Sequence, residues 1–187
     1  MIKALQNEYE RLSELDKKIL CFSGKIIISE TSKTLILLLI FALFHKIPEF
    51  LFSMVILFPI RCQIGGIHLK TYIGCLITTI AIFTTAIIIL PENIRLSEFA
   101  IIGLLLLCTI ICFHIGPIIN PTRPKLTILQ IKKCKLIACS SIICYIMLSF
   151  ALQFNRFIVC GAWIIIIQTL QLIAANLITR RKKSWAH

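Results

Sequence analysis

Four long apolar runs, at residues 72–90, 99–119, 136–154 and 157–178, limit what this chain can fold into. The shortest has 19 residues, which as an α-helix is about 28 Å long and matches the hydrocarbon core of a bilayer. Hydrophobic residues make up 58% of the 187 residues and charged residues only 15%, whereas about a quarter of a soluble domain is charged. The sequence therefore predicts an all-α integral membrane protein.

Two shorter apolar runs, at residues 34–44 and 47–60, precede these four. A helix needs about 20 residues to cross the hydrocarbon, so each run would have to extend into its polar neighbours to span it. Alternatively, the two runs form a shallow hairpin. Counting both as spans gives about six transmembrane helices.

The basic residues support the six-span arrangement. With the N-terminus in the cytoplasm, the inner segments carry 17 of the 20 Lys and Arg residues, and the outer segments carry only Lys46, Arg95 and Arg156. Such a bias is typical of a multi-pass cell membrane protein with both termini cytoplasmic. The net charge of +12 then serves topology and contact with anionic lipid, and we expect no nucleic acid partner because no basic soluble module is present.

Residues 1–25 contain recurring charges and are not a span. Their apolar positions recur at steps of three and four, which predicts an amphipathic helix that lies on the membrane or packs on a partner helix. We expect Ser23 and Gly24 to end it. The predicted domains are this interfacial helix, 1–25, and a six-helix transmembrane domain, 26–187. The apolar positions are Ile2, Leu5, Tyr9, Leu12 and Ile19.

Several classes of function are disfavoured by what the spans lack. The four long runs contain no acidic residue, which argues against a proton relay, an ion-coupled carrier or an intramembrane aspartyl peptidase. No H-E-x-x-H or G-x-S-x-G motif occurs. The nine cysteines lie mostly in apolar runs without a C-x-x-C pair, so we expect no metal, no cofactor and no disulfide framework.

One polar interruption, residues 61–75, combines Arg61, Gly65, Gly66, His68 and Cys75. Histidine and cysteine are the two side chains that a thiol peptidase needs, because one accepts the proton and the other attacks. In a straight helix their spacing leaves them about 10 Å apart, too far for proton transfer. We therefore expect a cytoplasmic catalytic loop in which the glycine pair lets His68 fold back toward Cys75.

Other roles for this loop remain open. Gln63, a hydroxyl or a backbone carbonyl could orient His68, and Arg61 and Lys70 could serve only the positive-inside bias. A non-enzymatic six-span binding or transport subunit is the main alternative to an enzyme. A membrane acyltransferase that uses His68 is a third hypothesis, but no motif for an acyl donor site is present.

The run Arg61-x4-Gly66-x-His68-x6-Cys75 resembles the accessory gene regulator protein B family, which consists of membrane cysteine endopeptidases that process quorum-sensing propeptides. The amphipathic N-terminus, the basic tail and the prolines at 117, 121 and 124 agree with it. The resemblance implies that Cys75 is the nucleophile and His68 the general base and later acid, with Arg61 and Gly66 in support.

The resemblance also implies the reaction and the partners. The enzyme would remove the C-terminal part of a small amphipathic propeptide, and a cysteine or serine of the peptide would resolve the thioester into a thiolactone or lactone. A homodimer in contact with membrane lipid is expected. Outside the loop, we expect His114 to lie near lipid headgroups and the polar amides of the last two spans to form interhelical hydrogen bonds. These amides are Gln153, Gln168, Gln171 and Asn176.

Overall fold

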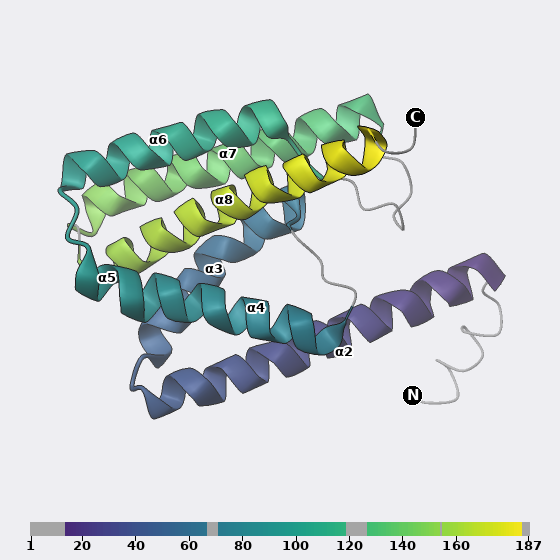
Figure 1. Ribbon diagram of the computed structural model, residues 1–187, viewed down its shortest axis with the longest axis horizontal. Helices are drawn as coiled ribbons and strands as arrows, with labels where there is room; N and C mark the ends of the chain where they lie inside the picture. Colours follow the sequence, from purple (N-terminus) through teal and green to yellow (C-terminus); the bar gives the residue numbers. More distant parts are fainter. Residues whose placement is uncertain (1–13, 67–70, 119–126, 154, 185–187) are drawn as a thin grey trace. The chain divides into compact units, whose positions relative to one another are not determined.

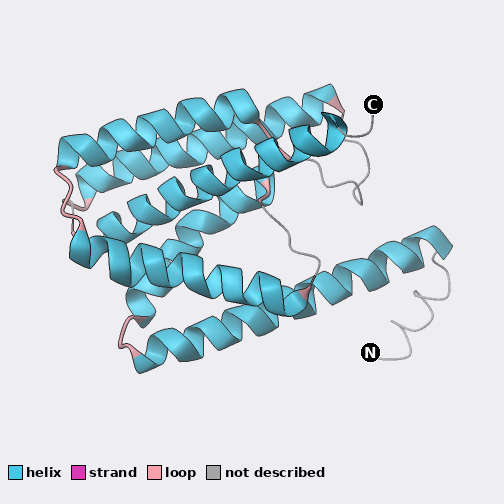
Figure 2. Cartoon of the chain, viewed as in Figure 1, coloured by secondary structure: helices cyan, strands magenta, loops and turns pink. Residues whose placement is uncertain are grey.

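The computed structural model describes residues 14–66, 71–118, 127–153 and 155–184, with side chains for the described residues from 28 to 179. This part of the chain is helical and contains no strand (Figure 2), so the all-α prediction is confirmed. The chain divides into two units, Met1–Leu43 and Phe44–His187. Each unit is considered by itself.

In the first unit, helix α2 runs from Glu14 to Leu43 without interruption. The prediction that Ser23 and Gly24 end a helix is therefore wrong. A single glycine destabilises a helix by only about 1 kcal/mol. The apolar residues after Gly24 each disfavour the helix by less than glycine does, so the helix continues through them. The 30 residues of α2 correspond to about 45 Å. All of the run 34–44 except Phe44 is thus the C-terminal part of a long helix that extends into its polar neighbours. Residues 1–13 lie outside the described part.

The second unit contains five helical segments that are long and apolar enough to cross a membrane, the number found among the described residues. The six-span prediction is thus supported for five spans, and the sixth, in α2, stays a prediction. The second of the five consists of α4 (Tyr72–Thr84), a π-helical segment η1 (Thr85–Ile89) and α5 (Leu90–Asn93). The other four are α3 (Ile47–Ile64), α6 (Glu98–Ile115), α7 (Ile128–Ala151) and α8 (Arg156–Ser184).

Helices α3 and α6 each pack against both α7 and α8, so these four helices form a ring (Figure 1). The α4–η1–α5 segment packs on the outside of α8. Successive spans alternate in direction, which gives the unit two ends. We name them the glycine end, where Gly65, Gly66 and Gly116 lie, and the arginine end, where Arg95 and Arg156 lie.

Helices α7 and α8 are antiparallel and joined by a short connection. Asn155 accepts a hydrogen bond from the backbone N–H of Ile158 and so caps α8. Helices α3 and α6 each pack more extensively against α7 and α8 than these two helices pack against each other. Apolar faces on all four helices are buried best when each helix has two partners.

Helix ends differ from the apolar runs where capping residues intervene. Helix α6 ends at Gly116, at φ +70°, before Pro117, and not at residue 119. Helix α7 begins eight residues before the predicted start at residue 136, because Thr127 and Gln130 form a capping box. The polar stretch 132–135 is therefore helical.

Buried cysteines help to join the spans. Cys160 donates a weak hydrogen bond to the carbonyl oxygen of Ile87, at 3.8 Å, in the π-helical segment where the regular helical bonds are displaced. Cys139 donates to the carbonyl oxygen of Thr109 at 3.7 Å. Cys108 and Cys112 are also buried, whereas Cys144 is exposed. Most of the described cysteines in the spans are thus buried, where they contribute to packing between helices.

Gly161 allows close contact between α8 and Tyr145 of α7. A Cβ added at Gly161 would lie 2.5 Å from the Tyr145 hydroxyl, which donates a hydrogen bond to the carbonyl oxygen of Ile158. Gly161→Ala should therefore destabilise the protein by about 1–3 kcal/mol through overpacking. Thermal unfolding of the purified protein in detergent measures this. Gly103→Ala is the matched control, because nothing lies within 4 Å of its Cβ position, and equal stability of the two variants would contradict this packing.

Candidate active site at the glycine end

The glycine turn, Gly65–Gly66, ends α3. Gly65 adopts φ +78° and ψ −157°, a conformation that essentially only glycine reaches. Its N–H donates to the carbonyl oxygen of Arg61 at 2.9 Å, and the carbonyl oxygen of Ile64 accepts from the N–H of Ile118 at 3.1 Å. The predicted non-helical conformation at the glycine pair is therefore present. The fold-back of His68 toward Cys75 concerns residues 67–70, which lie outside the described part of the chain.

Cys75 lies in the first turn of α4, at the same end of the unit. The predicted start of this span at Tyr72 is confirmed. Thr71 caps the helix, because its hydroxyl accepts a hydrogen bond from the N–H of Gly74 at 3.3 Å and its carbonyl oxygen accepts one from Cys75 at 3.1 Å. The Cys75 side chain is buried, with 8% of the residue exposed.

The remaining predicted site residues divide into two groups. Arg61 and Gln63 lie in the last turn of α3, so their placement in a loop is wrong. Arginine and glutamine are good helix formers, and α3 therefore continues until Gly65. His68 and Lys70 lie outside the described residues, and their roles stay predictions.

Sequence reasoning assigned Gln168 to an interhelical hydrogen bond, but the structure differs. The Gln168 side chain donates a hydrogen bond through Nε2 to the carbonyl oxygen of Gly65 at 2.7 Å. The partner of this α8 residue is therefore the glycine turn, and not a residue inside another helix. Gln171, three residues later, has a buried Oε1 for which no hydrogen-bond donor is found among the described residues. Two amide side chains one turn apart in an apolar helix indicate that this face of α8 contacts a polar group. The sequence alone does not identify that group.

Basic residues gather at the glycine end. The ammonium group of Lys135 lies 5.8 Å from the centre of the Phe113 ring, and the Lys135 side chain covers Gly116. His114 is exposed in the last turn of α6, in agreement with a position near headgroups.

Within the described part of the chain, no group of three His, Cys, Asp or Glu residues could hold a metal ion.

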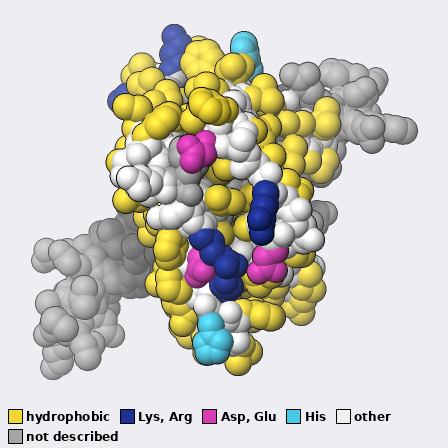
Figure 3. All heavy atoms as spheres, turned by 90° about the vertical axis from the view of Figure 1, so that its left-hand side faces the viewer, with side chains coloured by type: hydrophobic (Ala, Val, Ile, Leu, Met, Phe, Trp, Pro, Cys, Tyr) yellow, Lys and Arg dark blue, Asp and Glu magenta, His cyan; other side chains and the backbone are white. Residues whose placement is uncertain are grey.

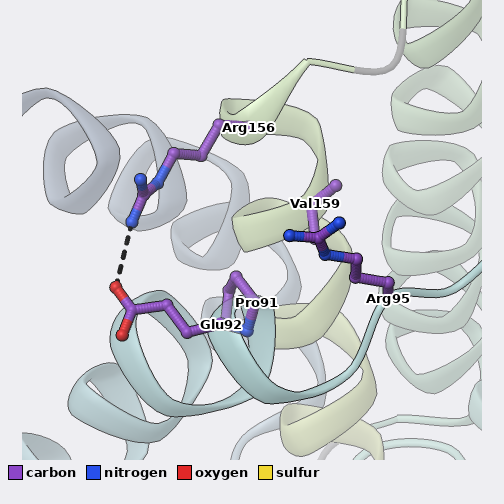
Figure 4. Close-up of a pocket in the computed structure, with 5 residues that line it drawn as sticks. All are labelled: Pro91, Glu92, Arg95, Arg156 and Val159. Atoms are coloured by element: carbon purple, nitrogen blue, oxygen red, sulfur yellow. Dashed lines mark hydrogen bonds and ion pairs between the residues drawn. The ribbon is translucent and has the colours of Figure 1, made fainter.

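The arginine end has a different character. Arg156 pairs with Glu92 at 3.3 Å and with Glu49 at 3.7 Å, and it lines a shallow pocket together with Arg95 (Figure 4). Figure 3, which views this end, shows basic side chains beside acidic ones. Lys46 also lies 3.7 Å from Glu49. These pairs join α3, α5 and α8, and we interpret them as structural.

The geometry defines a helical membrane protein with a cysteine in the first turn of a span and a glycine turn at the same end. The accessory gene regulator B family matches residues 1–172. This chain belongs to the accessory gene regulator B family, and the resemblance stated from its motifs is confirmed.

One curated relative is a putative AgrB-like protein of Clostridium beijerinckii. It is 35% identical to this chain over 113 residues, which cover 60% of this chain and 57% of the relative. The matched region thus spans little more than half of that relative's length. No solved structure matches this chain.

Proposed function

We propose that this protein is a membrane-embedded cysteine endopeptidase that cuts an autoinducer propeptide in quorum sensing. Membership of the accessory gene regulator B family implies a propeptide-processing role. The observation that carries the proposal is the position of Cys75, in the first turn of α4 at the same end as the glycine turn.

In the proposed reaction, His68 accepts the thiol proton of Cys75 and the sulfur attacks the carbonyl carbon of the scissile peptide bond. The C–N bond breaks, and His68 returns the proton to the leaving amine. The N-terminal part of the propeptide is then a thioester on Cys75. A cysteine or serine of that peptide attacks the thioester, Cys75 regains a proton, and a thiolactone or lactone leaves. Exclusion of water favours this internal attack over hydrolysis.

The charge distribution supports a cytoplasmic glycine end. Among the described residues, this end carries Arg61, Lys132, Lys133 and Lys135, whereas acidic side chains accompany the basic ones at the arginine end. Positive charge accumulates on the cytoplasmic side of membrane proteins. A basic surface also suits a propeptide with an acidic tail. Contact with lipid and homodimerisation belong to the proposal as implications of the family.

Trapping the thioester tests this mechanism. The protein in proteoliposomes is mixed with a small propeptide that has an amphipathic N-terminal helix, a central Cys or Ser and an acidic tail, in which the ring-forming Cys or Ser is replaced by Ala. Since ring closure is then blocked, the mass of the protein should rise by that of the N-terminal fragment, and peptide mapping should place the adduct on Cys75. Hydroxylamine should release it, because it cleaves thioesters. An adduct on another cysteine, or cleavage without any adduct, would refute the mechanism.

A further inference from the structure

The glycine turn has few local means of holding one conformation. Glycine is free to adopt many backbone angles, and two adjacent glycines precede the segment that contains His68. Local sequence therefore leaves the direction of the chain after Gly66 poorly determined. Contacts from elsewhere in the fold must select it.

Two long-range hydrogen bonds supply that selection. Ile118, which follows α6, donates to the carbonyl oxygen of Ile64 at 3.1 Å. Gln168 of α8 donates to the carbonyl oxygen of Gly65 at 2.7 Å, across 103 positions in sequence. Only the second uses a side chain, and that residue is 3% exposed. The donor is thus buried while Gly65 is half-buried, and a hydrogen bond is stronger where water is partly excluded than in bulk water.

The turn also lies directly against the amides of α8. A Cβ added at Gly66 would be 3.5 Å from both Gln168 Nε2 and Gln171 Oε1. Gly66 therefore approaches the amide pair at ordinary van der Waals distance, while Gly65 carries the hydrogen bond. Of the two glutamines, only Gln168 has a hydrogen bond to the turn among the described residues.

We propose that Gln168 is a positioning residue of the peptidase, and that its hydrogen bond to Gly65 fixes the conformation of the glycine turn that precedes His68 in the chain. This inference rests on the proposed function. Gln168 does not touch the reacting atoms in this account. Its loss should impair the chemical step, because a displacement of about 1 Å can reduce a rate about a hundredfold, while binding of the propeptide is retained.

Steady-state kinetics of the protein in proteoliposomes test this, with the same kind of amphipathic propeptide, its Cys or Ser intact, as substrate. Gln168→Met has similar length but no N–H donor, and should lower kcat about 10- to 100-fold with KM within about threefold of wild type. Gln168→Asn keeps the amide but is one methylene too short to reach Gly65, so it should lower kcat similarly. It also serves if the methionine variant does not fold.

Gln171→Met is the matched control. It changes the same residue type one turn along α8, but no hydrogen bond to Gln171 Oε1 is found among the described residues, so kcat should stay within about threefold of wild type. Unchanged kcat in Gln168→Asn or Gln168→Met would overturn the inference. So would a parallel loss of kcat and thermal stability in Gln168→Met and Gln171→Met, which would indicate packing alone. If cleavage persists in Cys75→Ala, the proposed function itself fails, which is a separate result.

Discussion

Replacing Cys75 with alanine is expected to abolish cleavage of the propeptide. Alanine has no nucleophile, and removal of one member of a nucleophile–base pair typically lowers the rate by more than about a thousandfold. His68→Ala should have a comparable effect, because the thiol then has no base and the leaving amine no acid. Co-expression with an amphipathic propeptide of the proposed kind, followed by mass spectrometry of the products, measures both losses.

The other cysteines provide controls for this experiment. Cys62 is exposed in the last turn of α3, at the glycine end. Cys62→Ala therefore tests whether this second thiol at the same end takes part in cleavage. Cys108→Ala and Cys160→Ala test buried thiols. All three should retain cleavage. Processing that survives in Cys75→Ala would exclude the peptidase mechanism and favour a non-enzymatic binding or transport subunit.

The second large effect is expected at Gly65. An alanine there must adopt φ near +78°, at a cost of about 1–3 kcal/mol, and its Cβ would lie 3.5 Å from the carbonyl oxygen of Ile118. The turn can relieve this strain only by rotating, which moves the Gly65 carbonyl away from Gln168. We therefore expect Gly65→Ala to lower kcat about 10- to 100-fold, with a smaller change in KM.

Gly66→Ala is the comparison for this variant. Gly66 has no positive φ, and an added Cβ would make ordinary contacts of 3.5 Å. Its loss of kcat should therefore be clearly smaller than that of Gly65→Ala. Thermal unfolding of both variants separates the local effect from global destabilisation. If the two alanine variants lose kcat equally, backbone conformation at Gly65 is not the cause.

The sequence predicted the spans well where apolar composition decides them. The start of α4 at Tyr72 and the run of α6 from Glu98 follow from hydropathy. In lipid, a single segment can form all its backbone hydrogen bonds internally only as a helix. The errors occur at polar boundaries. Hydropathy ended the second run at residue 60, but α3 continues to Ile64, since nothing in Arg61-Cys62-Gln63 stops a helix.

The candidate site divides along the same line. Cys75 at the start of a span and the glycine turn before it could be read from local residue types, and the family resemblance was carried by Arg61, Gly66, His68 and Cys75. The partner of Gln168 could not. An amide in an apolar helix must find a hydrogen bond, but many partners are chemically equivalent.

The sequence by itself thus determined an all-helical membrane protein, its basic surfaces and the residues of its proposed chemistry, because hydropathy, charge and glycine content act locally along the chain. Only the tertiary structure decided that α3 and α6 each pack against both α7 and α8, and that Gln168 holds Gly65. These features depend on which apolar faces and polar groups of separate segments contact one another in the folded chain. That choice is made by packing of the whole bundle, and no local pattern records it.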